Sequence, residues 1–143
     1  MVGDLQSRGN KLRILIVEDE PFIRLALESM LPELGFEIAG SAKTVSKALD
    51  IIANEQVDGA VLDVNLGLEK ADSVADALAA RQCPFIFMTG HSLANLPARH
   101  AHRAVLQKPF GFDTIEAITH REFGSPGVLP RTAKIRAPIE SEC

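Results

Sequence analysis

The sequence predicts an α/β fold with a doubly wound parallel sheet, and three observations lead to that prediction. Short apolar runs alternate along the chain with amphipathic stretches of helical period, which is typical of βαβ units. The first apolar run is continuous and rich in β-branched residues, as in strands buried on both faces of a parallel sheet. A length of 143 residues favours one domain with a substantial core.

The composition is that of an ordinary globular protein, with 46% hydrophobic and 24% charged residues. A net charge of −4 argues against a nucleic-acid partner, and no apolar run approaches the roughly 20 residues of a membrane span. The start, "MVGDLQSRGN", is polar and lacks a signal-peptide core. The two cysteines form no disulfide framework or metal spacing. We therefore expect a cytoplasmic protein with neither nucleic-acid nor membrane partners.

The first strand and helix have the clearest pattern. Leu12 to Val17 is the buried strand. A helix should begin at Pro21, where a missing N–H is harmless, and stop at Gly35, while Pro32 should bend or fray its last turn. Its apolar positions recur at helical spacing: Ile23, Leu27, Met30 and Leu34.

The middle of the chain repeats this alternation. A second strand is expected over Phe36 to Ala39 and a second helix over Val45 to Asn54. In "DGAVLDVNLG" a third buried strand covers Ala60 to Leu62 and ends at Asp63. A third helix should span Ser73 to Arg81.

Two strands and one helix complete the predicted fold. "PFIFMTG" is a fourth strand ending at Thr89, "AVLQ" is a fifth ending at Lys108, and a last helix covers Phe112 to His120. The segment between Thr89 and Ala104 contains Gly, Asn and Pro with few apolar anchors, so it predicts a loop or at most one short turn. These elements predict a mainly parallel (βα)5 sheet whose fourth helix is weak or replaced by a loop, and we expect it to have the flavodoxin-like order 2-1-3-4-5.

The two ends of the chain differ from the middle in composition. We expect residues 1–10 to be a disordered N-terminus and residues 11–122 to form the domain. Residues 123–143 are rich in Pro, Gly and small polar residues without a period, which predicts a flexible tail.

Polar residues gather where the predicted strands end. Glu18 and Asp19 end strand one, Asp63 ends strand three, Thr89 ends strand four and Lys108 ends strand five. Sites in open α/β sheets lie outside the carboxyl ends of the strands, and this strand order makes strands one and three neighbours. Adjacent carboxylates repel, so a cation should neutralise them; hard oxygen ligands in an open site suit Mg²⁺.

A carboxylate in such a site can be a nucleophile. Asp63 can accept a phosphoryl group if a metal ion and hydrogen-bond donors neutralise the equatorial oxygens. Thr89 can donate its hydroxyl to that group, and Lys108 can supply a positive charge.

Four motifs, "ILIVEDEP", "DGAVLDVNLG", "FMTG" and "QKPF", resemble in order and spacing the receiver domain of two-component response regulators, over Lys11 to Arg121. The resemblance implies that Asp63 is the phospho-acceptor, that Thr89 and Lys108 contact the phosphoryl group, and that Lys108 and Pro109 are joined by a cis bond. It implies a Mg²⁺ ion held by Glu18, Asp19, Asp63 and the backbone carbonyl of Asn65. The implied donor is a phosphohistidine of a sensor histidine kinase, with a downstream protein or phosphotransfer partner.

The stretch "PFIFMTGHS" also resembles the single-domain subgroup named FATGUY, in which a PFxFATG signature precedes a loop in place of the fourth helix. Met88 stands where that signature has Ala, and His91 where an aromatic residue is frequent. Val105 stands where receivers commonly carry a Tyr or Phe that swings inward on phosphorylation. We therefore expect switching by an order–disorder change in the 90–103 segment, triggered by Thr89.

The sequence also allows other roles for some of these residues and other functions for the chain. Glu20 is expected to face solvent, and His91, His100 and His102 are expected to be surface residues rather than metal ligands. The main functional hypothesis is a single-domain response regulator that accepts phosphate, dephosphorylates itself slowly and is not an enzyme. The alternatives are a Mg²⁺-dependent aspartyl phosphohydrolase, which usually has a second acid where Asn65 stands, and a binding module that works without phosphorylation.

Overall fold

The structure is a computed structural model that describes residues 11–90 and 96–124. Within these ranges a five-stranded parallel sheet has the order β2-β1-β3-β6-β7, which is the predicted order 2-1-3-4-5. The strands, in sheet order, are β2 (Glu37–Ala42), β1 (Arg13–Val17), β3 (Gly59–Asp63), β6 (Phe85–Thr89) and β7 (Val105–Gln107).

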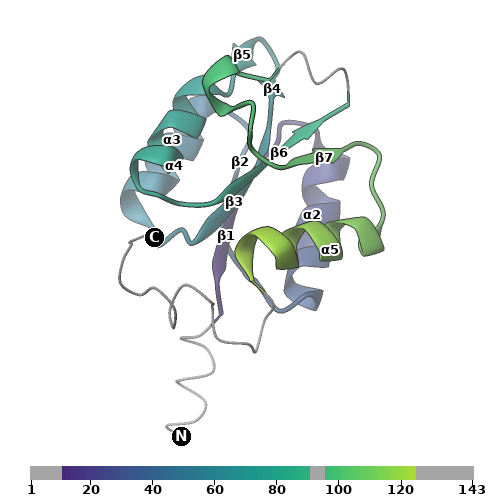
Figure 1. Ribbon diagram of the computed structural model, residues 1–143. Helices are drawn as coiled ribbons and strands as arrows, with labels where there is room; N and C mark the ends of the chain where they lie inside the picture. Colours follow the sequence, from purple (N-terminus) through teal and green to yellow (C-terminus); the bar gives the residue numbers. More distant parts are fainter. Residues whose placement is uncertain (1–10, 91–95, 125–143) are drawn as a thin grey trace, which may run out of the picture.

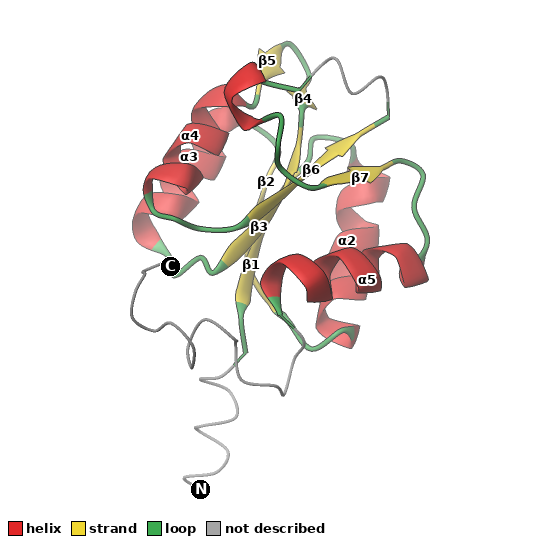
Figure 2. Ribbon diagram, viewed as in Figure 1, coloured by secondary structure: helices red, strands yellow, loops and turns green. Residues whose placement is uncertain are grey.

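Two pairs of helices cover the sheet (Figure 1), so the predicted α/β layering is confirmed. One face carries α3 (Val45–Asn54) and α4 (Asp72–Ala80), and the other carries α2 (Pro21–Glu33) and α5 (Phe112–Phe123). Figure 2 shows the strands as a central layer between them. Successive residues of a strand point to opposite faces, so β1 and β3, which are buried on both faces, contribute side chains to two separate hydrophobic clusters.

Helix α2 starts and stops through local signals. The Glu20 carboxylate accepts hydrogen bonds from the backbone N–H groups of Phe22 and Ile23, while Pro21 occupies the first turn. The helix ends one residue after Pro32, and Gly35 follows with a φ of 97°, a conformation that glycine adopts without strain. These signals place Glu18 and Asp19 in the short connection between β1 and α2.

Two elements are longer than the sequence predicts. Strand β2 was expected to end at Ala39 but continues to Ala42, because it pairs with the whole length of β1. Helix α5 was expected to end at His120 but continues to Phe123. Phe123 is buried, and its ring meets Phe36 edge-on at a centroid distance of 5.9 Å. Residue 123 therefore belongs to the helix, while the predictions for residues 1–10 and 125–143 lie outside the described residues.

The connection between β6 and β7 has the predicted character where it is described. Residues 96–103 contain a single 3₁₀ turn, Ala98–His100, so the prediction of a loop or one short turn is confirmed there. Residues 91–95 lie outside the described ranges. A small hairpin that was not predicted follows Asp63: β4 (Asn65–Leu66) pairs with β5 (Glu69–Lys70) around Gly67, whose φ is 63°.

In the described part of the chain, no helix has the length and apolar character needed to span a lipid bilayer.

Candidate functional site

Five predicted site residues lie at one edge of the sheet. Glu18 and Asp19 follow β1, Asp63 is the last residue of β3, Thr89 is the last residue of β6, and Lys108 follows β7. Parallel strands bring their carboxyl ends to the same edge, so neighbouring strands place these residues side by side.

Three carboxylates make up the acidic part of the site. One oxygen from each of Glu18, Asp19 and Asp63 lies within 4.8 Å of the others. Glu18 is fully buried and Asp63 is 6% exposed, whereas Asp19 is more open to solvent. Three negative charges this close repel one another strongly, so the cluster requires compensation by cations.

Lys108 supplies part of that compensation. Its Nζ lies 2.9 Å from Glu18 Oε1 and 3.1 Å from Asp63 Oδ2. Burial alone would lower the pKa of Lys108, but the hydrogen bond to Glu18 and the charge of Asp63 outweigh it, so the pKa is raised. The ammonium group therefore stays charged between the two buried carboxylates.

The surroundings of Glu18 change the pKa of its carboxyl group. Burial raises its pKa from 4.5 to about 7, although the Glu20 N–H, 3.0 Å from Oε2, and Lys108 act in the opposite direction. One ammonium group thus does not fully offset three carboxylates. The remaining negative charge and the hard oxygen donors fit a divalent cation such as Mg²⁺, with Glu18, Asp19 and Asp63 as the residues able to hold it.

Asp63 lies where these groups converge. Its Oδ1 accepts a hydrogen bond from the Asn65 backbone N–H at 3.3 Å, and its Oδ2 faces Lys108. Asn65 begins the β4–β5 hairpin, which keeps its main chain beside the acidic cluster. Asp63 is thus held by neighbours while a small part of its side chain reaches the surface.

Thr89 and Lys108 are connected through the backbone. Thr89 is buried, and its carbonyl oxygen accepts a hydrogen bond from the Lys108 N–H at 2.9 Å. The bond between Lys108 and Pro109 is cis, as the resemblance implied. The register of β6 and β7 therefore sets the position of both residues at the edge of the sheet.

The structure tests three predictions about other polar residues, Glu20, His100 and His102. Glu20 is exposed as expected, but it caps α2, a role indicated only by its place before Pro21. The prediction that His100 is a surface residue is wrong, because the residue is only 5% exposed. Its Nε2 lies 2.8 Å from Asp76 Oδ1, and its ring packs against Phe85, so burial is compensated by a partner distant in sequence. His102 is exposed as expected, and His91 lies outside the described residues.

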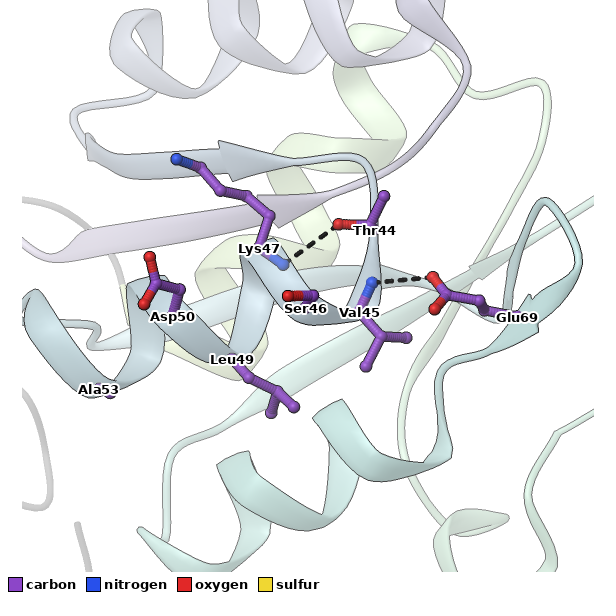
Figure 3. Close-up of a pocket in the computed structure, with 8 residues that line it drawn as sticks. All are labelled: Thr44, Val45, Ser46, Lys47, Leu49, Asp50, Ala53 and Glu69. Carbon is purple, nitrogen blue, oxygen red and sulfur yellow. Dashed lines mark hydrogen bonds between the residues drawn. The ribbon is translucent and has the colours of Figure 1, made fainter.

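The surface of the described residues has two notable hollows. An open one of about 710 Å³ surrounds the start of α3, where the Glu69 carboxylate accepts a hydrogen bond from the Val45 N–H and the Thr44 hydroxyl oxygen accepts one from the Lys47 N–H (Figure 3). An apolar groove of about 410 Å³ reaches the acidic site through one shared residue, Lys108. Its lining is Phe22, Ile23, Ala26, Met30, Lys108, Pro109 and Phe110.

Proteins of known name are similar to this chain in sequence. Over 109 residues the chain is 34% identical to the phyllosphere-induced regulator PhyR of Methylorubrum extorquens, covering 73% of this chain and 41% of that protein. Over 111 residues it is 33% identical to the transcriptional regulatory protein PdtaR of Mycobacterium tuberculosis, covering 74% of this chain and 54% of that protein. The chain thus spans only about half the length of these relatives or less.

Solved structures of similar proteins have the same fold. SdrG from Sphingomonas melonis Fr1 is 46% identical, with a TM-score of 0.68 over 76% of this chain and 92% of that one. The receiver domain of PhyR from Erythrobacter litoralis is 30% identical, with a TM-score of 0.70 over 80% of this chain and 91% of that one. Residues 14–120 match the family described as the response regulator receiver domain. With its strand order and its acidic edge, this chain belongs to the receiver domain family of two-component response regulators.

Proposed function

We propose that this chain is a single-domain response regulator that accepts a phosphoryl group on Asp63 from the phosphohistidine of a sensor kinase. The observation that carries the proposal is the placement of Asp63 between Lys108 and two further carboxylates at the edge of the sheet. Receiver domains generally act as signalling modules, and we propose that this one is not an enzyme beyond slow self-dephosphorylation.

The transfer requires one bond to form and one to break. A carboxylate oxygen of Asp63 attacks the phosphorus atom, and the P–N bond of the phosphohistidine breaks. The electron pair of that bond returns to the ring nitrogen of the donor, and a proton on the other ring nitrogen allows the donor to leave as neutral imidazole. The product is an acyl phosphate on Asp63, and attack by water on its phosphorus atom returns the free carboxylate.

The charge of the transferred group needs compensation. Glu18, Asp19, Asp63 and the backbone carbonyl of Asn65 would hold a Mg²⁺ ion, which supplies positive charge to the phosphoryl oxygens. Lys108 already contacts Asp63 and supplies a second positive charge. In this proposal the Thr89 hydroxyl donates a hydrogen bond to a phosphoryl oxygen, since Thr89 ends the strand next to β3.

The apolar groove is proposed as the contact surface for the donor kinase. Phosphate passes directly from histidine to Asp63, so the surface around the donor histidine must touch the rim of the acidic site. The groove shares Lys108 with that site, and Phe22 at its edge is 79% exposed. An exposed aromatic side chain beside an apolar groove is suited to packing against an apolar helix of the donor.

Several finer features belong to the same proposal. The 3₁₀ turn between β6 and β7 supports membership of the FATGUY subgroup, whose fourth helix is replaced by a loop. We propose that the protein acts in the cytoplasm and passes its signal by contact with a downstream protein or by onward phosphotransfer.

A labelling experiment tests the proposal. Incubation with a small-molecule phosphodonor and Mg²⁺ should add one phosphoryl group to the wild-type protein and none to Asp63→Asn, as measured by intact mass. The label should be lost in hydroxylamine, which cleaves acyl phosphates. Equal labelling of the two proteins would remove Asp63 from its role, and steady release of phosphate from generic phosphate esters would favour the phosphohydrolase instead.

A further inference from the structure

The His100 ring occupies an aromatic pocket on one face of the sheet. The residue is 5% exposed, and its ring lies edge-on to Phe85 and Phe87 at centroid distances of 5.7 Å and 6.4 Å. The guanidinium group of Arg103 covers the Phe85 ring at 4.3 Å. Residues 96–103 contain one 3₁₀ turn and no α-helix, so contacts of individual side chains hold this segment against β6.

Asp76 of α4 connects this segment to the neighbouring helix. Its Oδ1 lies 2.8 Å from His100 Nε2 and 2.9 Å from Arg99 Nε, and its Oδ2 lies 2.6 Å from Arg99 Nη2. The hydrogen bonds from Arg99 and His100 hold the pKa of Asp76 well below its usual range. One ionised carboxylate therefore anchors both polar side chains of the turn.

The arrangement is nevertheless weakly held. The side chains of Arg99 and Asp76 are 61% and 44% exposed, and exposed ion pairs contribute little stability. Within residues 96–103, the buried nitrogen atoms His100 Nδ1 and Arg103 Nε have no hydrogen-bond partner. Burying a polar group without a hydrogen-bond partner costs free energy. The contacts of residues 96–103 are therefore among the less stable contacts of the molecule and open more easily than the core.

The same face of β6 leads to the phosphorylation site. Alternate residues of a strand point to one face, which places Phe85, Phe87 and Thr89 in one row. The residue paired with Phe87 on β7 is Val105, which is aliphatic. If Thr89 moves toward a phosphoryl group, the first side chains to be displaced are therefore Phe87 and Phe85 in the same row, and these two rings hold His100.

We propose that Asp76 and His100 form a latch that holds residues 96–103 against β6 in the unphosphorylated protein and opens when Asp63 carries a phosphoryl group. This latch rests on the proposed function and adds its regulation. The His100 ring is the moving aromatic group, and Asp76 is a positioning residue that acts through it. Because a ligand shifts an equilibrium only by its different affinity for the two states, loss of the latch strengthens binding of a phosphoryl mimic.

Beryllofluoride with Mg²⁺ provides the mimic for the first measurement. The apparent affinity, followed by amide shifts in the full chain, should increase at least threefold in Asp76→Ala relative to wild type. Asp76→Glu should restore most of the wild-type value, because it keeps the carboxylate. The matched control is Asp113→Asn, an exposed aspartate in the first turn of α5, which should bind as wild type does.

The second measurement follows the His100 ring itself. Its carbon-bound protons, assigned by comparison with His100→Gln, lie beside two phenylalanine rings and so carry ring-current shifts. Saturation with beryllofluoride should move them toward free histidine values in the wild type. In Asp76→Ala they should lie near those values before beryllofluoride is added.

The outcomes separate the two proposals. If the wild type binds no beryllofluoride, the proposed function fails and the latch with it. If the wild type binds, but Asp76→Ala binds with equal or lower affinity, the latch alone is overturned. Unmoved His100 protons at saturation, with Asp63 and Thr89 amides shifted, overturn it as well.

Discussion

The ammonium group of Lys108 lies 3.1 Å from Asp63 Oδ2, although β6 separates their strands in the sheet. The long side chain crosses this gap at the open edge and meets Glu18 at 2.9 Å. One cation therefore connects two carboxylates from different strands, and this relationship leads to the first prediction.

Replacing Lys108 with Met should slow labelling of Asp63 by a small-molecule phosphodonor by about 10²-fold, the usual effect of removing one group that stabilises developing charge. The rate is measured by intact mass at saturating Mg²⁺. The control is Lys47→Met, an exposed lysine of α3, which should label at the wild-type rate. An unchanged rate in Lys108→Met would show that the ammonium group has no part in the transfer.

The raised pKa of Glu18 predicts a dependence of stability on pH. The folded state keeps a proton on Glu18 up to a pKa of about 7, whereas the unfolded chain releases it near 4.5. The folded state therefore binds more protons, and the free energy of unfolding of the metal-free protein should decrease as pH rises from about 4.5 to about 7. Urea denaturation across this range measures the decrease, which Glu18→Gln should diminish.

Magnesium binding should become stronger as pH rises, in contrast to the stability of the metal-free protein. The ion requires ionised Glu18, so its binding releases a proton, and its affinity should rise several-fold between pH 6 and pH 8. Titration followed by amide shifts of Glu18, Asp19 and Asp63 measures the affinity. An affinity independent of pH would mean that Glu18 is ionised before the metal binds.

If the apolar groove is the contact surface for the kinase, a substitution in it should slow phosphotransfer from the kinase but not labelling by a small-molecule donor. Phe22→Asp should slow phosphotransfer from the cognate kinase at least tenfold, because it places a charge in the proposed contact surface. Labelling by a small-molecule donor should stay at the wild-type rate, since Phe22 is 79% exposed and not part of the core. Ala53→Asp on α3, at the opposite face of the sheet, is the control. Equal effects of both substitutions on the kinase reaction would move the contact surface elsewhere.

Packing at the end of α5 gives a prediction about stability. A Cβ atom at Gly59 would lie 2.8 Å from two ring carbons of Phe123 and 3.1 Å from Ile14 Cδ1. Gly59→Ala should therefore lower the free energy of unfolding by about 1–3 kcal/mol, the typical cost of overpacking a core. Gly111→Ala, where a Cβ would meet nothing within 4 Å, should change it by much less. Chemical denaturation of the two variants makes the comparison.

The sequence was sufficient to predict the edge of the sheet at which the site lies. Alternating apolar runs and helical periods predict a parallel sheet, and the flavodoxin-like strand order expected for it brings Asp63 next to Glu18, as the structure has it. The boundaries of β2 and α5 were harder. Gly40 and Ser41 interrupt the apolar pattern of an edge strand, and Phe123 follows a charged pair that resembles the end of a helix.

The sequence by itself determined the fold class, the acidic cluster and the identity of its lysine, because each follows from local patterns repeated at strand ends. Only the tertiary structure decided that His100 is buried, since its partner Asp76 lies 24 residues away on another element. The same holds for Glu69, which caps α3 from a hairpin 24 residues beyond Val45. A single contact between distant side chains leaves no periodic trace in the chain, so it becomes visible only after the sheet has brought its helices together.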